Sequence, residues 1–208
     1  MNARWGDRHA RRRDILTAGR SLLADRGLPA LQMREVAQRA GIALGTVYSY
    51  FPTKEALFSA MYAERLDEFR LEIESALGQT EDLEEMLVEV ALAYREMYAE
   101  FGSELDVLSA RTDDDGSNSA VSVELLKSAG SIWLAMREIV QRAGAKDPDL
   151  SLTLLWSSVT GLANQFTGVR HELHSFSYEE AVRYAMHLLV QGLHRERDQG
   201  KPNRRKRQ

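Results

Sequence analysis

The segment GIALGTVYSYFPTKEALF, at residues 41–58, gathers hydroxyl, aromatic and basic side chains around a single proline. Residues 44–50 have the spacing of a short helix, and Pro52 ends it because proline disfavours the helical conformation of the residue before it. Hydroxyl groups and a nearby lysine are suitable ligands for phosphate oxygens and base edges. The pattern predicts a helix whose outer face can enter the major groove of DNA.

A second short helix is predicted just before this one, at residues 34–40. Gly41 permits a tight turn between the two helices, and Val36, Ala37 and Val47 supply the small or apolar side chains that their crossing requires. The pair is therefore interpreted as a helix-turn-helix. With Ile42, Val47 and Phe51 facing inward, the outer face of the second helix is left with Leu44, Gly45, Thr46, Ser49 and parts of Tyr48 and Tyr50, and Lys54 follows at the start of the next helix.

Charge is distributed unevenly along the chain, although the formal net charge is only −4. Residues 1–62 carry ten basic and five acidic residues, whereas residues 63–200 carry 12 basic and 26 acidic ones. The last eight residues add five basic residues and no acidic one. This asymmetry indicates that only the N-terminal part meets a polyanion, because the acidic part would be repelled by it. Arginines 4, 8, 11, 12 and 13 are further candidates for phosphate or minor-groove contacts.

The stretch MREVAQRAGIALGTVYSYFPTKEALF resembles the signature of the TetR family of one-component transcriptional regulators, and the resemblance covers residues 11 to about 62. It implies phosphate contacts from Tyr48, Tyr50 and Lys54, base contacts from residues 44–46, and a base or phosphate contact from Arg34. Two departures stand out. Gln32 replaces the usual threonine cap, and Ala43-Leu44 replaces a common Ser-Lys/Arg pair, so that a helix cap worth ~1 kcal/mol and a basic contact are both missing.

Helical spacing continues through the rest of the chain, and strand signals are nearly absent. We predict an all-α fold of about nine helices: a three-helix head followed by a bridging fourth helix from residue 54, and then helices at about 81–101, 103–111, 119–143, 148–171 and 178–197. The expected domains are a helix-turn-helix DNA-binding domain at 9–69, a ligand-binding and dimerisation domain at 70–198, and a basic tail at 199–208 that is either a disordered end or a DNA contact.

One three-helix head makes too few contacts for operator affinity, so the acidic body must pair two of them on a palindromic DNA operator. The family dimerises through its last two helices, which implies a homodimer interface here at Leu152, Leu155, Trp156, Val159, Val182, Met186 and Leu189. The family also holds a small-molecule inducer in the body, and ligand binding is expected to release DNA through the fourth helix. The predicted pocket residues are Phe69, Tyr94, Met97, Tyr98, Phe101, Trp133, Met136 and Phe166, with polar anchors at Arg137, Asn164 and Arg170. An aromatic or methionine stripe at helical spacing is more often plain core than a pocket.

Composition excludes several classes of protein. The chain has no cysteine, and it lacks a signal peptide and any apolar run of the roughly 20 residues that a membrane span needs. We expect a soluble cytoplasmic protein without a cofactor. An all-helical enzyme is a remote alternative, because the pairs His171/His174 and His187/His194 have no acidic partner at metal-ligand spacing. The second alternative is a DNA-binding protein of the same fold that acts without a ligand or responds to a protein partner.

Overall fold

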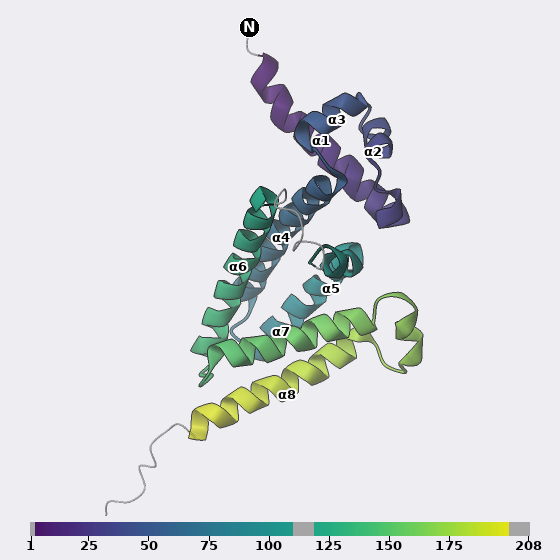
Figure 1. The fold of residues 1–208 in the computed structure, drawn as a ribbon. Coiled ribbons are helices and arrows are strands. Elements are labelled where there is room, and N and C mark those ends of the chain that lie inside the picture. The colour runs from purple at the N-terminus through teal and green to yellow at the C-terminus, as the bar shows by residue number, and fades with distance from the viewer. Residues whose placement is uncertain (1–2, 110–118, 200–208) are drawn as a thin grey trace, which may run out of the picture. The chain divides into compact units, whose positions relative to one another are not determined.

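The computed structural model describes residues 3–109 and 119–199 of the 208-residue chain, and helices make up nearly all of these two ranges (Figure 1). Within them the structure contains eight α-helices and no strand, which confirms the predicted all-α class. The helices are α1 (Ala3–Arg26), α2 (Met33–Arg39), α3 (Leu44–Tyr50), α4 (Lys54–Gln79), α5 (Leu83–Ser109), α6 (Ser119–Arg142), α7 (Pro148–Gln165) and α8 (Tyr178–Gln199). Short 3-10 helices lie at Leu28–Ala30 and Gly168–Leu173.

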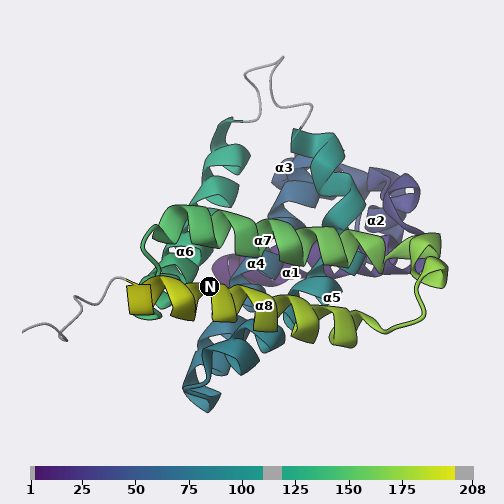
Figure 2. The same ribbon diagram turned by 90° about the horizontal axis from the view of Figure 1, so that it is seen from below.

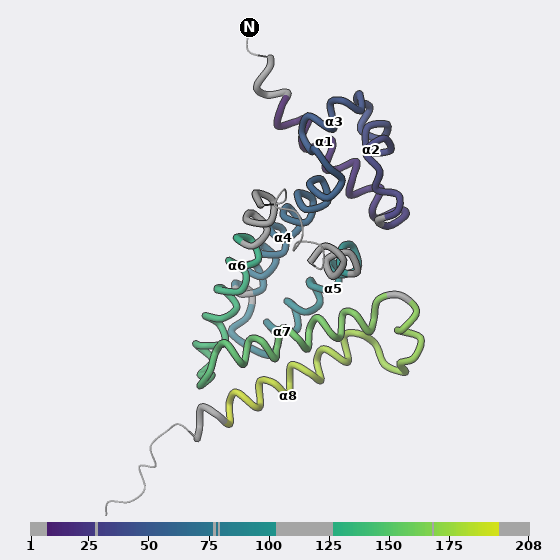
Figure 3. Tube along the Cα trace, in the orientation of Figure 1, coloured from purple at the N-terminus to yellow at the C-terminus, as the bar shows by residue number. Residues whose placement is uncertain are grey.

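The chain folds into two compact units. The first contains residues 1–67 and 100–128, and the second contains residues 68–99 and 129–208. Both α4 and α5 therefore begin in one unit and end in the other. Figure 3 lets the reader follow α4 along the chain by its colour. The domain boundary predicted between residues 69 and 70 stays a prediction, and the basic tail at 200–208 lies outside the described residues.

The core of the first unit forms between α1 and the helices that pack on it. Ile15, Leu16, Leu22 and Leu23 lie on one face of α1 and are almost completely buried. Gly27, with φ of 70°, ends this helix in the left-handed conformation that glycine favours. Phe101 from the C-terminal part of α5 inserts next to two aromatic rings of α4, and its ring centroid lies 5.6 Å from that of Phe58 and 5.4 Å from that of Tyr62.

Two predicted helix boundaries are wrong. The two helices predicted at 81–101 and 103–111 are one continuous helix, α5, that passes through Gly102, and residues 110–111 lie outside the described residues. A glycine in a helix interior costs only about 1 kcal/mol relative to alanine, and burial of the neighbouring Phe101 outweighs it. The helix predicted at 148–171 ends at Gln165, where the Thr167 hydroxyl donates to the Ala163 carbonyl at 2.7 Å and a 3-10 turn follows.

In the second unit, α7 and α8 run antiparallel and lie side by side (Figure 2). Side chains fix where these helices begin. Asp147 caps α7 by accepting from the Leu150 amide at 3.0 Å. Ser177 and Glu180 form a reciprocal capping box at the start of α8, and the Ser177 amide holds the pKa of Glu180 below its ordinary value. Polar side chains at the N-terminal ends of α7 and α8 thus determine where these two helices begin.

Tyr178, the first residue of α8, is buried and donates its hydroxyl to the Ala91 carbonyl of α5 at 2.7 Å. Burial raises the pKa of this phenol above its ordinary value. At a pH at which the unfolded chain has lost the phenol proton, the folded protein therefore still keeps it. The stabilising contribution of Tyr178 is therefore fully present below the unfolded pKa of about 10 and declines as the pH rises above it.

Tyr178→Phe is expected to lower the free energy of unfolding by about 1 kcal/mol at pH 7, because one buried hydrogen bond is lost. It should also flatten the decline in stability above pH ~10. Urea unfolding between pH 7 and 11 measures both effects, with Tyr48→Phe at a half-exposed ring as the matched control. An unchanged alkaline decline in Tyr178→Phe would contradict this account.

Candidate nucleic-acid interface

The turn between α2 and α3 is closed by backbone hydrogen bonds. The Gly41 amide donates to the Gln38 carbonyl at 3.2 Å, and the Ile42 amide donates to the Ala37 carbonyl at 3.0 Å. Gly41 itself has φ of 65°, a left-handed conformation that glycine adopts without steric cost. The predicted role of Gly41 in the turn is confirmed.

The inner face of α3 packs as the sequence predicts. Val36 and Val47 are fully buried where α2 and α3 cross, and Ala37 and Phe51 are nearly so. Ile42 is only half-buried, so it contributes less to this core than predicted. With Val47 and Phe51 fixed inside, the rotation of α3 about its axis is determined, and its opposite face is set toward solvent.

The outer face of α3 carries the residues predicted to contact DNA. Gly45, Tyr48 and Ser49 are exposed, and Leu44, Thr46 and Tyr50 are partly exposed. Tyr48 keeps 47% of its surface accessible. The Ser49 hydroxyl donates to the Thr46 carbonyl at 2.7 Å, so its oxygen remains available only as an acceptor. The structure brings these residues together on one short helix, and their contact with DNA remains a prediction.

The helix ends around this face differ in how they are capped. Gln32 and Ala43 make no side-chain cap at the starts of α2 and α3, in agreement with the two departures seen in the sequence. At α4, in contrast, Thr53 Oγ1 accepts from the Ala56 amide at 3.1 Å, and Lys54 follows as the first helical residue. A capped helix start next to a lysine is a favourable place for a phosphate group.

Intramolecular ion pairs reduce the basic charge that the first unit can offer to DNA. Arg12 lies 2.9 Å from the Glu64 carboxylate and 5.6 Å from the ring centroid of Phe51. Arg39 pairs with Asp25 at 2.6 Å. Arg12, which the sequence suggested as a possible DNA contact, is thus already held by α4, while Arg8, Arg13 and Arg34 are exposed. The side chain of Arg4 lies outside the described residues.

The residues predicted to line an inducer pocket mostly fill the interior. In the second unit, the ring of Tyr94 lies 5.9 Å from Phe69, 6.0 Å from Tyr98 and 4.9 Å from Trp156. Met97, Met136 and Phe166 are buried, and Trp133 is half-buried. Phe101 belongs to the other unit. These contacts describe packing, and the ligand role of these side chains stays a prediction.

The three predicted polar anchors are already paired with other side chains. Asn164 donates to the Tyr98 hydroxyl at 2.6 Å and accepts from Arg170. Arg137 forms a two-pronged ion pair with Asp149 at 2.7 and 3.0 Å, which holds the pKa of that carboxyl below its ordinary value. A ligand that used these groups would have to replace existing hydrogen bonds.

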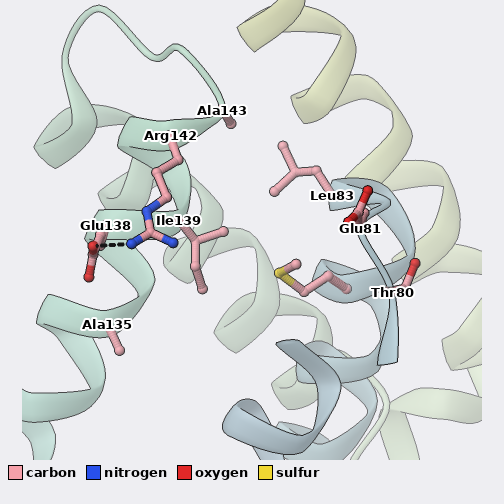
Figure 4. A pocket seen from close by; sticks show the side chains of 9 residues that line it. Thr80, Glu81, Leu83, Ala135, Glu138, Ile139, Arg142 and Ala143 are labelled. Carbon is pink, nitrogen blue, oxygen red and sulfur yellow. Dashed lines mark hydrogen bonds and ion pairs between the residues drawn. The ribbon is translucent and has the colours of Figure 1, made fainter. Parts of the chain in front are cut away.

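A cavity of about 550 Å³ opens elsewhere in the second unit, between the α4–α5 corner and the C-terminal part of α6. Figure 4 shows Leu83 and Ile139 pointing into it from opposite sides, with an ion pair between Glu138 and Arg142 at its edge. Its remaining lining residues are Thr80, Glu81, Met86, Ala135 and Ala143. None of the eleven predicted pocket residues is among them. The regular spacing of Ala135 and Ile139 on α6 and of Ala143 just after its end was the sequence signal that could have revealed it.

A second groove, of about 440 Å³, lies between α4 and α5 in the same unit. It is lined by Glu72, Ser75, Ala76, Glu89, Leu92, Ala93 and Glu96. Three carboxylates and no basic group make it less suited to an apolar ligand than the cavity beside α6.

The predicted dimer residues lie mostly in the interior of the single chain. Leu152, Leu155, Val159, Val182 and Met186 are each at most 2% exposed, so they pack as core residues of the unit, and their role in dimerisation stays a prediction. Trp156 and Leu189 are partly buried as well. The opposite faces of the same two helices expose large apolar side chains that were not among the predicted dimer residues: Leu150 and Leu154 on α7, and Tyr184 and Leu188 on α8.

Comparison with known proteins agrees with this geometry. Residues 15–61 match the model of the family described as "Bacterial regulatory proteins, tetR family". This N-terminal part of the chain belongs to the TetR family of DNA-binding domains. It is 47% identical over 60 residues to the transcriptional repressor KstR of Rhodococcus jostii, a match covering 27% of this chain and 28% of that protein. It is 25% identical over 182 residues to KstR of Mycolicibacterium smegmatis, covering 74% of this chain and 89% of that protein.

Solved structures share the TetR fold at low sequence identity. A protein of unknown function from Rhodococcus sp. RHA1 aligns with a TM-score of 0.71 and 19% identity, over 88% of this chain and 95% of that one. FadR of Bacillus subtilis, solved in complex with stearoyl-CoA, aligns with a TM-score of 0.63 and 18% identity, over 86% and 98% of the two chains. Within the described residues, no helix is long and apolar enough to cross a membrane, and no cluster of three or more potential metal ligands occurs.

Proposed function

We propose that this protein is a homodimeric transcriptional repressor that binds a palindromic operator and is released from it by a small, largely apolar ligand. The observation that supports this proposal most is the outer face of α3. Gly45, Thr46 and Tyr48 lie on this face, and Val47 and Phe51 are buried on the opposite side. Its relatives in the family include repressors, among them KstR. The described contacts leave this face open to a major groove.

Two copies of this face are needed for operator affinity, with recognition helices spaced by about 34 to 36 Å or a multiple of it. The outer faces of α7 and α8 supply a self-complementary surface for pairing two chains through four helices. Leu154 on α7 and Leu188 on α8 are more than half exposed, and a side chain at Gly161 or Gly192 would meet nothing within 4 Å. Such a surface allows close helix approach and buries apolar area.

The cavity beside α6 is the best supported ligand site. Its volume falls within the range of about 300 to 1,000 Å³ typical of small-molecule sites. Its walls are mainly apolar, and the rim carries Thr80, Glu81 and the Glu138–Arg142 pair. FadR, a structural neighbour, was solved with stearoyl-CoA, which supports an amphipathic ligand of the lipid class for this chain too.

Release requires that the ligand bind more tightly to a state in which the two heads no longer match the operator spacing. A coupling of about 1 to 3 kcal/mol changes operator affinity 5- to 150-fold, which is sufficient for regulation. The alternative within the same fold is a regulator that responds to a protein partner. It would show specific DNA binding that no small molecule relieves.

Gly45→Ala is expected to change the stability of the protein and its affinity for the operator in opposite directions. A methyl group at this position would meet no atom within 4 Å, so the fold should tolerate it, and the helix should gain about 0.5 to 1 kcal/mol. DNA that lies against the helix would be displaced by the new methyl. We therefore expect a higher Tm together with a roughly tenfold weaker operator affinity. A variant that gains stability and binds DNA as well as the wild type would show that DNA does not approach Gly45 closely.

The experiment that tests the proposed function is titration of the purified protein into labelled DNA from upstream of its own gene, competed with unrelated DNA. Stearate and stearoyl-CoA are then added as ligand probes. Specific binding relieved by either probe supports a ligand-regulated repressor. Specific binding that persists with both probes favours the protein-partner alternative, and equal binding to unrelated DNA contradicts the proposal.

A further inference from the structure

Arg12 on α1 joins three elements of the first unit. Its Nη1 donates to Oε1 of Glu64 on α4 at 2.9 Å. The central carbon of the same guanidinium lies 5.6 Å from the ring centroid of Phe51, the residue at the C-terminal end of α3. A planar guanidinium can lie over an aromatic ring and donate to a carboxylate at the same time. All three residues belong to the segment 1–67, so the contact lies inside one compact unit.

The sequence of α1 explains why Arg12, and not the arginine after it, makes this contact. Arg12 precedes Ile15 by three residues and Leu16 by four, and both of these side chains are buried. Residues at this spacing share one face of a helix, so Arg12 is turned toward the interior of the unit. Arg13 is exposed. The arginines at 11–13 therefore do not form a single surface for phosphates.

Phe51 occupies the corner between the two helices that are expected to contact DNA. Its backbone is extended, with φ of −133° and ψ of 102°, and the residue is 5% exposed. Tyr48 lies three residues before it on α3, and Lys54 lies three residues after it as the first residue of α4. Pro52, which follows Phe51, has no amide hydrogen with which to stabilise the corner. The spacing between the Tyr48 and Lys54 side chains therefore depends on how the ring of Phe51 is held.

We propose that Arg12 is a positioning residue for operator recognition. It holds the ring of Phe51 and, through Glu64, attaches α1 to α4. The corner between α3 and α4 then keeps Tyr48 and Lys54 at the spacing that the operator phosphates require. This inference rests on the proposed function. It gives Arg12 a role behind the DNA-reading helix, in place of the direct phosphate contact that the sequence suggested.

Glu64→Gln distinguishes the two roles of Arg12, because they predict changes of opposite sign. If Arg12 contacted a phosphate directly, loss of the Glu64 carboxylate would free the guanidinium and remove a repulsive charge, so affinity for any DNA would rise or stay unchanged. If Arg12 positions Phe51, the same substitution weakens its hold on the ring. We then expect operator affinity to fall about fivefold, with no loss of affinity for shuffled DNA of the same length.

Asp14→Asn is the matched control for the change in charge. Asp14 is an exposed carboxylate of the same unit, and its ion pair with Arg11, at 4.0 Å, lies within α1. The control removes the same charge but leaves the contact between Arg12 and Phe51 in place. Its operator affinity should therefore equal or slightly exceed that of the wild type.

Arg12→Lys tests the guanidinium itself, because it keeps the positive charge and loses the plane that lies over the ring. It should weaken operator binding as much as Glu64→Gln does. The two substitutions together should cost less than about twofold more than either alone, because both break one contact. The side chains of Arg12 and Glu64 are 39% and 37% exposed, so each variant should remain folded, which thermal unfolding checks. If Glu64→Gln nevertheless unfolds, Arg12→Lys supplies the same comparison between operator and shuffled DNA.

Four results would overturn the inference if the wild type binds its operator specifically. These are unchanged or tighter operator binding by Glu64→Gln, an equal loss of affinity for operator and shuffled DNA, wild-type operator affinity in Arg12→Lys, and an equal loss in Asp14→Asn. The proposed function would stand in each case. A wild-type protein that binds operator and shuffled DNA equally would contradict the proposed function and overturn this inference with it.

Discussion

The double substitution Leu154→Arg with Leu188→Arg is expected to convert the dimer into a monomer and to weaken operator binding by more than about 100-fold. Both side chains are more than half exposed in the single chain, so the fold of each subunit should persist. In a dimer the same positions would be buried, and two unpaired guanidinium groups per subunit would have to be desolvated. A monomer would also lose the gain in affinity that comes from linking two heads.

Sedimentation at micromolar concentration and DNA titration measure the two effects together. Leu71→Arg is the matched control, because Leu71 is 56% exposed on α4, close to the 57% of Leu154, but lies outside α7 and α8. The control should remain dimeric and bind DNA normally. A double variant that stays dimeric, or a control that dissociates equally, would show that the outer face of α7 and α8 is not the interface.

Tyr48→Ala combined with Lys54→Ala is expected to lower operator affinity by about 100-fold, with roughly tenfold from each residue, since a hydrogen bond or ion pair to a phosphate contributes about 1 to 2 kcal/mol. Tyr48 is 47% exposed, so its removal should leave the core intact. Lys54→Ala alone should reduce the slope of log affinity against log salt by about 1, because one counterion fewer is released.

Tyr48→Phe separates the hydroxyl of the tyrosine from its ring. If the hydroxyl contacts a phosphate, Tyr48→Phe should lose nearly as much affinity as Tyr48→Ala. Circular dichroism and thermal unfolding establish that each variant is folded before it is compared. Wild-type affinity in the double variant would remove α3 and the start of α4 from the DNA interface.

The head was predictable because its positions are locally constrained. Gly41 needs a positive φ, Val47 and Phe51 share one helix face at a spacing of four residues, and Pro52 ends a helix, so each residue indicates the same arrangement. The start of α7 was predictable for the same reason, because the segment AKDPD at residues 145–149 supplies the capping residue Asp147 and then Pro148 at the first helical position. Local rules sufficed wherever the residues that decide the structure are close in sequence.

The proposed dimer face was not predictable in this way, because α7 is apolar on two sides. Leu152 and Val159 lie on one side, and Leu150 and Leu154 lie on the other. Periodicity shows that both faces are apolar but does not show which of them packs inside the chain. Only the packing against α8 and the rest of the unit resolves this.

The residues that line the cavity beside α6 were not predicted, for a related reason. The pocket was predicted around large aromatic residues such as Phe69, Tyr94 and Tyr98, whose rings pack against one another and fill the interior. The cavity instead lies beside small residues such as Ala135 and Ala143, whose side chains leave space unfilled. The continuity of α5 through Gly102 was also missed: a break was predicted between residues 101 and 103, although the neighbouring Phe101 is fully buried.

The most direct measurement of the central claim is the affinity of the purified wild-type protein for DNA from upstream of its own gene and for a shuffled sequence of the same length, each across a salt series. We expect the natural sequence to bind at least about 1,000-fold more tightly at physiological salt, and both affinities to fall steeply as salt is raised. Equal affinity for the two sequences at every salt concentration would contradict the claim that α3 reads an operator.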